Sequence, residues 1–341
     1  MKCVAIKDKK LLEIKEIAEP VANGNDVIIE VSKCGICGSD LHYFEMGLPK
    51  GLVMGHEYSG VVLDKGSRDD LEIGNRVTAL PISPCMKCEA CVNGNINYCL
   101  QTWNEATGLA LTNPGGLTKK IKIRPDMVIK LDDRITDEEA AMVEPSAVSL
   151  HAINLADIKI GDKVLIIGGG IIGLGSAMFA KLAGASHITL FETNEQRGNK
   201  ALKLGVVDEF INVSDENIMN EFMQKHQASF DKVLECCGNS KAVTSSLIFA
   251  KVGATVVLVG VSMDQITIPS AIALMHELTI KGAIAYTKQD FERCIELISN
   301  KQIDVLKFLD KQITLEETQE AYDELINSKT DTIKIIVDLK K

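Results

Sequence analysis

The sequence predicts an α/β protein that combines a β-rich domain with a doubly wound parallel sheet. Its 341 residues suffice for two domains of about 150 residues each. Residues 1 to about 130 carry short β-branched runs, such as 26–31, 58–63 and 76–80, between glycines, asparagines and prolines. These runs favour a barrel-like β domain. From about residue 145, apolar strands alternate with helical segments, which is typical of a parallel sheet with helices on both faces.

The elements expected after residue 145 follow from hydrophobic periodicity and from glycines at helix ends. The strands and helices of the alternating region are strand 163–168, helix 170–183, strand 187–191, helix 194–204, strand 230–235 and strand 253–260. The last part of the chain predicts helices at 288–300 and 315–327 and a strand at 332–339.

Composition and charge exclude several classes of protein. The 47 acidic and 37 basic residues give a net charge of −10, and an acidic chain without basic blocks repels nucleic acid. The N-terminus lacks the apolar core of a signal peptide. The longest uncharged stretch, 164–180, has 17 residues and five glycines, whereas a membrane helix needs about 20 apolar residues. We therefore expect a cytoplasmic protein that binds neither nucleic acid nor membrane.

Four of the ten cysteines lie within fifteen residues of each other. In a chain without a secretion signal, cysteines are thiols or metal ligands rather than disulfides. The spacing C-x2-C-x2-C-x7-C can place four thiolates around one zinc ion, which leaves no open coordination position. We predict a structural zinc site formed by Cys85, Cys88, Cys91 and Cys99, whose metal stabilises the fold.

A glycine-rich turn, 168–173, matches the pattern GxGxxG between an expected strand and an expected helix. Such a turn lets the backbone approach a pyrophosphate at the helix N-terminus. Glu192, 19 residues after Gly173, would accept hydrogen bonds from the adenosine ribose and repel a 2′-phosphate, which favours NAD over NADP. Arg197 is a nearby cation that could help to tolerate that phosphate. The predicted cofactor-binding residues are Gly168, Gly170, Ile172, Gly173, Glu192, Arg197 and Val259.

A second metal site is predicted from dispersed residues. One thiolate, one imidazole and one or two carboxylates can hold zinc and leave a position for water or substrate, and the candidates are Cys37, His56, Glu57 and Glu144. Cys34 and Cys37 also form a C-x-x-C pair that could be a redox dithiol. A redox pair should open a helix in a βαβ unit, whereas this one follows a strand in a β region. We therefore assign Cys34 to packing and Cys37 to the metal.

The chain resembles the zinc-dependent medium-chain dehydrogenase/reductase family, nearest to its sorbitol, 2,3-butanediol and threonine dehydrogenase branch. The resemblance covers essentially the whole chain and is carried by segments 34–43, 55–57 and 143–151 and by the four-cysteine loop. It implies a GroES-like catalytic domain that is interrupted by a Rossmann domain. The implied division is a first catalytic part at 1–146, an NAD-binding domain at 147–281 and a catalytic return segment at 282–341.

The same resemblance implies roles for the dispersed residues. Cys37, His56 and Glu144 match the positions of catalytic zinc ligands. Glu57 matches a residue that either binds the metal or stands behind a ligand, so the choice between the two carboxylates stays open. Ser39 and His42 match proton-relay positions, which makes Ser39, His42 and Glu57 the candidate catalytic residues. Zinc would favour loss of the alcohol proton, the relay would carry it to solvent, and NAD would accept the hydride.

The substrate expectation rests on one departure from the branch. Sorbitol dehydrogenases carry an arginine where Ala285 stands, and Tyr43, Phe44 and Tyr286 lie in the matching pocket segments. We therefore expect a short secondary alcohol or a 2,3-butanediol-like vicinal diol ahead of sorbitol. A sugar alcohol, a polyol phosphate and threonine are the alternatives, and a homo-oligomer, dimeric or tetrameric, is the expected assembly. A nucleotide-binding sensor without turnover is the alternative from another class, and it would lack the open zinc site.

Overall fold

The computed structural model describes residues 1–262, 265–327 and 330–341, which form two compact units. The first unit contains residues 1–145, 287–327 and 334–341, and the second contains 146–286 and 328–333. The sequence-based division placed its boundaries after residues 146 and 281 and assigned 328–333 to the return segment. The chain thus leaves the second unit, returns to it briefly, and re-enters the first unit at Lys334.

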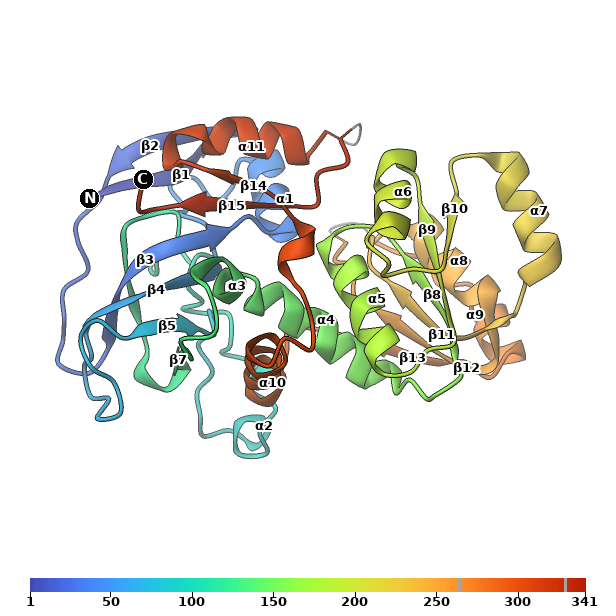
Figure 1. Cartoon of the computed structure of the whole chain (residues 1–341), viewed down its shortest axis with the longest axis horizontal. Helices are drawn as coiled ribbons and strands as arrows, with labels where there is room; N and C mark the ends of the chain where they lie inside the picture. Colours follow the sequence, from blue (N-terminus) through green and yellow to red (C-terminus); the bar gives the residue numbers. More distant parts are fainter. Residues whose placement is uncertain (263–264, 328–329) are drawn as a thin grey trace. The chain divides into compact units, whose positions relative to one another are not determined.

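The first unit is built on a mostly antiparallel sheet with the strand order β14-β15-β3-β4-β5-β7, in which β6 also pairs with β3 (Figure 1). Among the described strands of this unit, only β14 and β15 pair in parallel, and β1 and β2 form a separate antiparallel pair. The strands are β1 Lys2–Asp8, β2 Leu11–Glu16, β3 Val27–Gly35, β4 Glu57–Asp64, β5 Arg76–Ala79, β6 Lys120–Ile123, β7 Val128–Lys130, β14 Leu309–Ile313 and β15 Lys334–Asp338.

Short helices complete the first unit. Two of them begin at threonines that accept the backbone N–H three residues later: Thr136 before α3 and Thr287 before α10. Such caps satisfy N–H groups that have no partner within the helix. The helices are α1 Gly38–Met46, α2 Glu89–Val92, α3 Asp137–Ala141, α10 Lys288–Ser299 and α11 Thr318–Leu325, with 3-10 turns at Ile96–Tyr98, Pro125–Met127, Leu306–Phe308 and Leu315–Glu317. Helix α4, Val143–Ala156, crosses from the first unit to the second.

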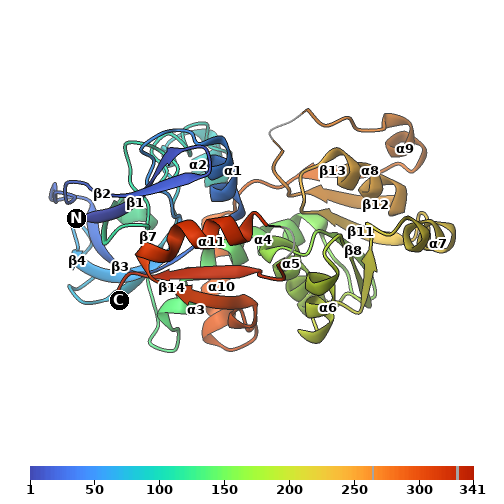
Figure 2. The ribbon, with the colours of Figure 1, turned by 90° about the horizontal axis from the view of Figure 1, so that it is seen from above.

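The second unit contains a six-stranded, fully parallel sheet with the order β10-β9-β8-β11-β12-β13. The order reverses between β8 and β11, and ligands of doubly wound sheets bind at the carboxyl ends of the strands at such a reversal. Its strands alternate with helices (Figure 2). The strands are β8 Lys163–Ile167, β9 His187–Glu192, β10 Glu209–Asn212, β11 Phe230–Glu235, β12 Ala250–Leu258 and β13 Thr279–Gly282. The helices are α5 Ile171–Leu182, α6 Glu195–Lys203, α7 Glu216–His226, α8 Ser240–Phe249 and α9 Ser270–Met275.

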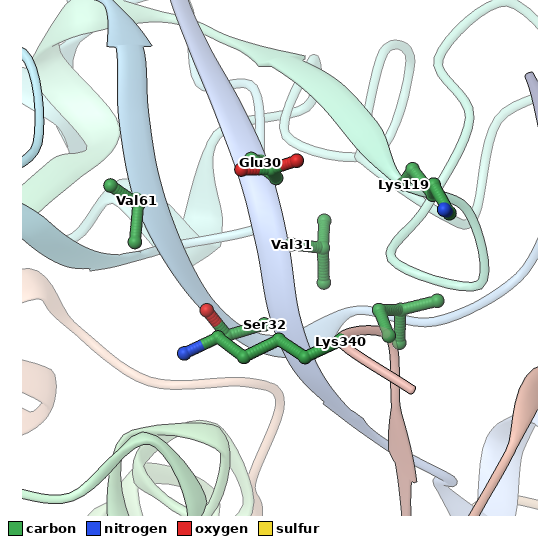
Figure 3. A pocket seen from close by; sticks show the side chains of 7 residues that line it. Glu30, Val31, Ser32, Val61, Lys119 and Lys340 are labelled. Atoms are coloured by element: carbon green, nitrogen blue, oxygen red, sulfur yellow. The ribbon is translucent and has the colours of Figure 1, made fainter.

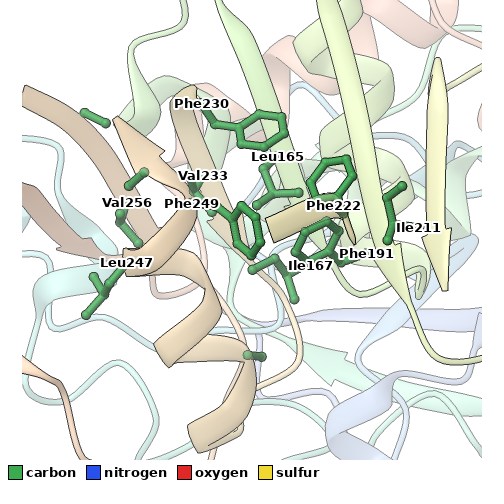
Figure 4. Close-up of a cluster of buried hydrophobic side chains, with 13 residues drawn as sticks. Leu165, Ile167, Phe191, Ile211, Phe222, Phe230, Val233, Leu247, Phe249 and Val256 are labelled. Atoms are coloured by element: carbon green, nitrogen blue, oxygen red, sulfur yellow. The ribbon is translucent and has the colours of Figure 1, made fainter. Parts of the chain in front are cut away.

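Aromatic side chains dominate one core cluster of this sheet (Figure 4). Phe191 packs edge-to-face against Phe249 and Phe222, with ring centroids 5.0 and 5.4 Å apart. Leu165 and Val233, from β8 and β11, are completely buried beside them. This packing stabilises the central strands, so the turns at their carboxyl ends start from well-ordered positions. In the described part of the chain, no helix combines the length and the apolar character that crossing a membrane requires.

Candidate active site

The four-cysteine loop brings its thiols together. The Sγ atoms of Cys85, Cys88, Cys91 and Cys99 all lie within 4.8 Å of one another, and those of Cys85 and Cys91 are 3.9 Å apart. With Zn–S bonds of about 2.3 Å, a tetrahedral site requires S–S separations of about 3.8 Å. The loop therefore fits a four-thiolate zinc site without an open position.

Backbone amides prepare this loop for a cation. Cys99 Sγ accepts N–H groups from Cys85 and Gln101, both at 3.4 Å, and Cys85 Sγ accepts that of Cys88 at 3.3 Å. The N–H of Cys85, with that of Gln101, lowers the pKa of Cys99 to about 6. Burial, together with a neighbouring thiol, raises the pKa of Cys91 to about 12. The thiols thus differ in how readily they ionise, and binding of a metal would replace the remaining thiol protons.

A second cluster combines Cys37, His56 and Glu57, whose ligand atoms also lie within 4.8 Å of one another. Cys37 follows β3 as the N-cap of α1, and Glu57 opens β4, opposite Gly35 in the sheet. His56 and Glu57 are buried and Cys37 is half-buried. Three ligands of three chemical types leave one tetrahedral position open.

Asp40 links two members of this cluster, and the sequence analysis did not assign it a role. One carboxylate oxygen, Oδ2, accepts the backbone N–H of Cys37 at 3.2 Å, and Oδ1 lies 3.4 Å from Nδ1 of His56. A carboxylate behind one imidazole nitrogen orients the other toward a metal. Burial opposes protonation of His56, but the charges of Asp40 and Cys37 raise its pKa well above the usual value.

Lys334 was also missed by the sequence analysis. Its ammonium group forms an ion pair with Glu57, and both side chains are 0% exposed. Burial disfavours the charged amine, but Glu57 and Cys37 raise the pKa of Lys334 above its ordinary value. The sequence does contain a signal for this residue, because Lys334 is the single lysine in the otherwise apolar run 333–337. A charge that is buried with such a run requires a partner of opposite charge.

The cluster of Cys37, His56 and Glu57 contains a buried carboxylate oxygen that a metal ion could satisfy. Glu57 Oε1 is buried and has no hydrogen-bond partner among the described residues. An unpartnered carboxylate oxygen beside a thiol and an imidazole is costly to bury, and a divalent cation would remove that cost. The donor set therefore fits zinc.

The other predicted residues around this cluster are placed as follows. Ser39 Oγ lies 3.3 Å from Cys37 Sγ and 3.5 Å from His56 Nε2, whereas His42 is exposed on α1. Glu144 is buried in the first turn of α4. It is not among the three residues whose ligand atoms gather within 4.8 Å.

The C-x-x-C pair of Cys34 and Cys37 does not open a βαβ unit. Helix α1 begins directly after Cys37, but the strands on either side of it, β3 and β4, pair antiparallel. Cys34 itself is 0% exposed and forms no disulfide, and burial raises the pKa of its thiol far above the usual value. A buried thiol of this kind is unreactive, so burial gives a second reason to assign Cys34 to packing.

The glycine-rich turn of the second unit joins β8 to α5, at the reversal of strand order. Gly168 has φ +105°, and a side chain at Gly173 would collide with the carbonyl oxygen of Gly168. Gly170 is the exposed N-cap of α5, and a Cβ there would meet nothing within 4 Å. The first N–H groups of α5, from Ile171 and Ile172 onward, thus border open space that an anionic pyrophosphate could fill.

Glu192 braces this turn from the end of β9. Its Oε2 accepts the N–H of Gly169 at 2.7 Å, and its Oε1 accepts those of Thr193 and Asn194 at 2.7 and 2.9 Å. Arg197 lies 3.9 Å from Oε2, and its Nη2 donates to the carbonyls of Thr330 and Thr332 at 3.5 and 3.4 Å. Glu192 therefore shapes the glycine turn.

The loop after β12 also reaches the reversal of strand order. The N–H of Val259 and that of Gly260 donate to the carbonyl of Glu235 at 2.8 and 2.9 Å. A Cβ at Gly260 would collide with the backbone of Gly238. Val259 is thus held beside the end of β11.

A cavity of the first unit is lined by other residues. Figure 3 shows its lining, which includes Glu30, Ser32, Lys119 and Lys340. It measures about 250 Å³ and contains no member of either metal-ligand cluster.

Comparison with known proteins identifies the family. Residues 23–133 match the alcohol dehydrogenase GroES-like domain, and residues 172–300 match the zinc-binding dehydrogenase domain. The sorbitol dehydrogenase of Bombyx mori is 31% identical over 323 residues, covering 92% of this chain and 91% of that protein. The chain therefore belongs to the zinc-dependent medium-chain alcohol dehydrogenase family, in its sorbitol dehydrogenase-like branch. It is an oxidoreductase of the alcohol dehydrogenase type, with zinc and NAD(H) as cofactors.

Solved structures agree with this assignment. The 2R,3R-butanediol dehydrogenase of Bacillus subtilis is 28% identical and superposes with a TM-score of 0.87 over 99% of both chains. A protein described as a zinc-binding dehydrogenase from Sinorhizobium meliloti 1021, bound to NADP, is 26% identical with a TM-score of 0.88 over 99% of both chains. The GroES-like and Rossmann folds expected from the sequence are thereby confirmed.

Proposed function

We propose that this protein oxidises the secondary alcohol of a vicinal diol to a ketone, with NAD as hydride acceptor. The observation that carries the proposal is the cluster of Cys37, His56 and Glu57, which offers three metal ligands and an open position in a chain that also has a dinucleotide-type glycine turn. The nucleotide-binding sensor, the alternative from another class, would have no use for such a cluster.

The residues around the open metal site would have separate roles in the reaction. When bound, zinc would supply Lewis-acid polarisation that lowers the pKa of an alcohol hydroxyl. Cys37, His56 and Glu57 would hold it, and Asp40 would keep the imidazole oriented. The Ser39 hydroxyl, beside two of these ligands, would accept the alcohol proton while giving up its own toward the exposed His42, which would release a proton to solvent.

The substrate class follows from chemistry shared by named relatives. Sorbitol and 2,3-butanediol, after which two of them are named, both carry adjacent secondary hydroxyls. Ala285 provides no cation for the further hydroxyls of a hexitol, so we place a short diol ahead of sorbitol. Phe44 does not support this ranking, because it is completely buried and its ring lies 5.2 Å from that of Tyr322 in an edge-to-face contact. Tyr286 is also completely buried.

The test of the substrate class is a panel assay of NADH formation with the zinc-loaded protein. We expect the highest kcat/KM for 2,3-butanediol and lower values for sorbitol, xylitol and threonine. A site built to hydrogen-bond the further hydroxyls of a hexitol rejects a substrate without them by about 10⁴ or more. A sorbitol-type site would therefore rank 2,3-butanediol far below sorbitol, and the panel separates the two cases clearly. A higher value for sorbitol or xylitol would reverse the ranking, and no oxidation of any alcohol would contradict the proposed activity.

The proton relay predicts two different pH profiles. The Ser39→Ala variant should oxidise alcohols on the order of 10²-fold more slowly at every pH, because it lacks the first proton acceptor. The His42→Ala variant should be slowed mainly at low pH, where solvent offers little base to replace the imidazole. Added imidazole should restore the His42→Ala rate. An unchanged pH profile in this variant would remove His42 from the relay.

Cofactor selectivity is predicted from Glu192. The wild type should favour NAD over NADP in kcat/KM, and Glu192→Gln should reduce that preference by about 10- to 100-fold, because a hydrogen bond to a charged group contributes about 1.5–3 kcal/mol. The comparison variant is Arg197→Ala, which removes the neighbouring cation and should not lower the preference for NAD. A wild type that favours NADP would contradict the assignment and point to Arg197 as a phosphate ligand.

We also propose that the chain assembles as a homodimer or homotetramer. Sedimentation velocity of the purified protein would give its mass directly, and a monomer at micromolar concentration would contradict this proposal.

A further inference from the structure

A buried lysine reaches the candidate metal ligand Glu57 across an intervening strand. Lys334 opens β15 and Glu57 opens β4, and β3 runs between them. In this ladder Ile336 pairs with Gly35, and Gly35 pairs with Glu57. Directly paired residues point to the same face of a sheet, as do residues two apart along a strand. Lys334 and Glu57 therefore share one face.

The contact depends on the missing side chain of Gly35. A Cβ at this position would collide with Glu57 Oε2 and would lie 3.0 Å from Lys334 Cε. Across this gap, Lys334 Nζ donates to Glu57 Oε2 and, at 2.8 Å, to the carbonyl of Ile36. Two oxygen acceptors thus hold the ammonium group in place.

The two carboxylate oxygens of Glu57 consequently have different environments. Oε2 is bound to the ammonium group of Lys334, whereas Oε1 is buried without a hydrogen-bond partner among the described residues. An adjacent positive charge weakens the attraction of a carboxylate for a metal cation, and burial strengthens that effect. Glu57 is thereby prepared to bind a metal through one oxygen only.

Resting on the proposed function, we propose that Lys334 is a positioning residue that makes Glu57 a one-oxygen, readily displaced ligand of the catalytic metal. The open site then binds its metal less tightly than its ligands alone would allow. In return, a coordination position stays available for the alcohol, because Glu57 is prevented from occupying it with a second oxygen.

The test measures metal binding without alcohol or NAD. Mild chelation first empties the open site and leaves zinc in the closed four-cysteine site. This protein is then titrated with Co²⁺ against a competing chelator, and the visible spectrum reports the ligands of the ion at the open site. The Lys334→Met variant should bind Co²⁺ at the open site about 10- to 100-fold more tightly. Removing a group that supports a metal ligand weakens binding by about this factor, and removing a cation that opposes the metal should change affinity in the other direction. Its spectrum should differ from that of the wild type, because Glu57 can then contribute both oxygens. Lys334→Arg, which keeps the charge, should resemble the wild type.

Lys33→Met is the matched control. Lys33 is a second buried lysine of the first unit, paired with Glu138 and Asp338 at 3.0 and 2.9 Å, and neither residue belongs to the cluster. This variant should leave both affinity and spectrum unchanged. If Lys334→Met matches the control, or binds Co²⁺ more weakly than the wild type, the proposed role of Lys334 is wrong.

A double variant covers the case in which an unpaired buried Glu57 prevents folding. Removing both charges at once avoids that penalty, so Lys334→Met is also made in a Glu57→Gln background. There the tightening should shrink by at least about tenfold, as a double-mutant cycle requires of a pair that acts together. An equal tightening in both backgrounds would show that Lys334 acts on the metal directly and would overturn the proposal.

The two proposals fail in different assays. An enzyme that oxidises no alcohol, yet responds to Lys334→Met as expected, would refute the proposed function alone. An enzyme with the expected turnover and unchanged Co²⁺ binding in this variant would refute only the role of Lys334.

Discussion

The Cys37→Ser variant is expected to lose alcohol oxidation by on the order of 10³-fold or more while remaining folded. The thiolate is one of the three ligands that the described residues bring together at the open site, and a hydroxyl is a poor replacement for it. Loss of Lewis-acid assistance removes several kcal/mol of transition-state stabilisation, at about 1.4 kcal/mol per factor of ten. Metal analysis should find zinc reduced from two ions per chain to one, with an unchanged circular dichroism spectrum.

Cys34→Ala is the matched control for this experiment. Cys34 belongs to the same C-x-x-C pair but is completely buried, so its loss should affect packing only. The variant should keep two zinc ions and nearly full turnover. Activity that survives in Cys37→Ser, or zinc that is lost in Cys34→Ala, would contradict the assignment of Cys37 as the ligand.

The Cys88→Ser variant should show the opposite pattern, with a large loss of stability before any loss of catalysis. Breaking a closed four-thiolate site removes metal binding that contributes directly to folding. The melting temperature should fall by on the order of 10 °C, since each kcal/mol lowers it by about 2–4 °C in a domain of this size. One zinc ion per chain should remain, and the turnover of the folded fraction at low temperature should stay close to that of the wild type.

The control here is Cys294→Ser, which places a hydroxyl in the core of α10. Cys294 is completely buried and belongs to neither metal cluster. Its replacement should reduce stability but leave two zinc ions bound. Equal zinc content in the Cys88→Ser and Cys294→Ser variants would rule out the structural zinc site.

Local sequence signals determined much of the fold and the short-range sites. The four cysteines share one loop, and the glycine turn follows directly on its strand, so close spacing in sequence forced proximity in space. The elements expected at 187–191, 194–204 and 288–300 were confirmed as β9, α6 and α10, because their periodicity is strong. Helix α1 was missed, since its nine residues are too short to display a helical period.

Only the tertiary structure decided how residues far apart in sequence meet. The sequence left open whether Glu57 or Glu144 joins Cys37 and His56; the pairing of β3 with β4 brings Glu57 into the cluster. Lys334 comes from the last strand, 277 residues after Glu57, and it reaches the carboxylate because β15 pairs with β3 beside Gly35. Periodicity reports which face a residue points to, but not which strand lies next to it. The register of the sheet supplies that information, and with it the charge placed behind the metal ligands.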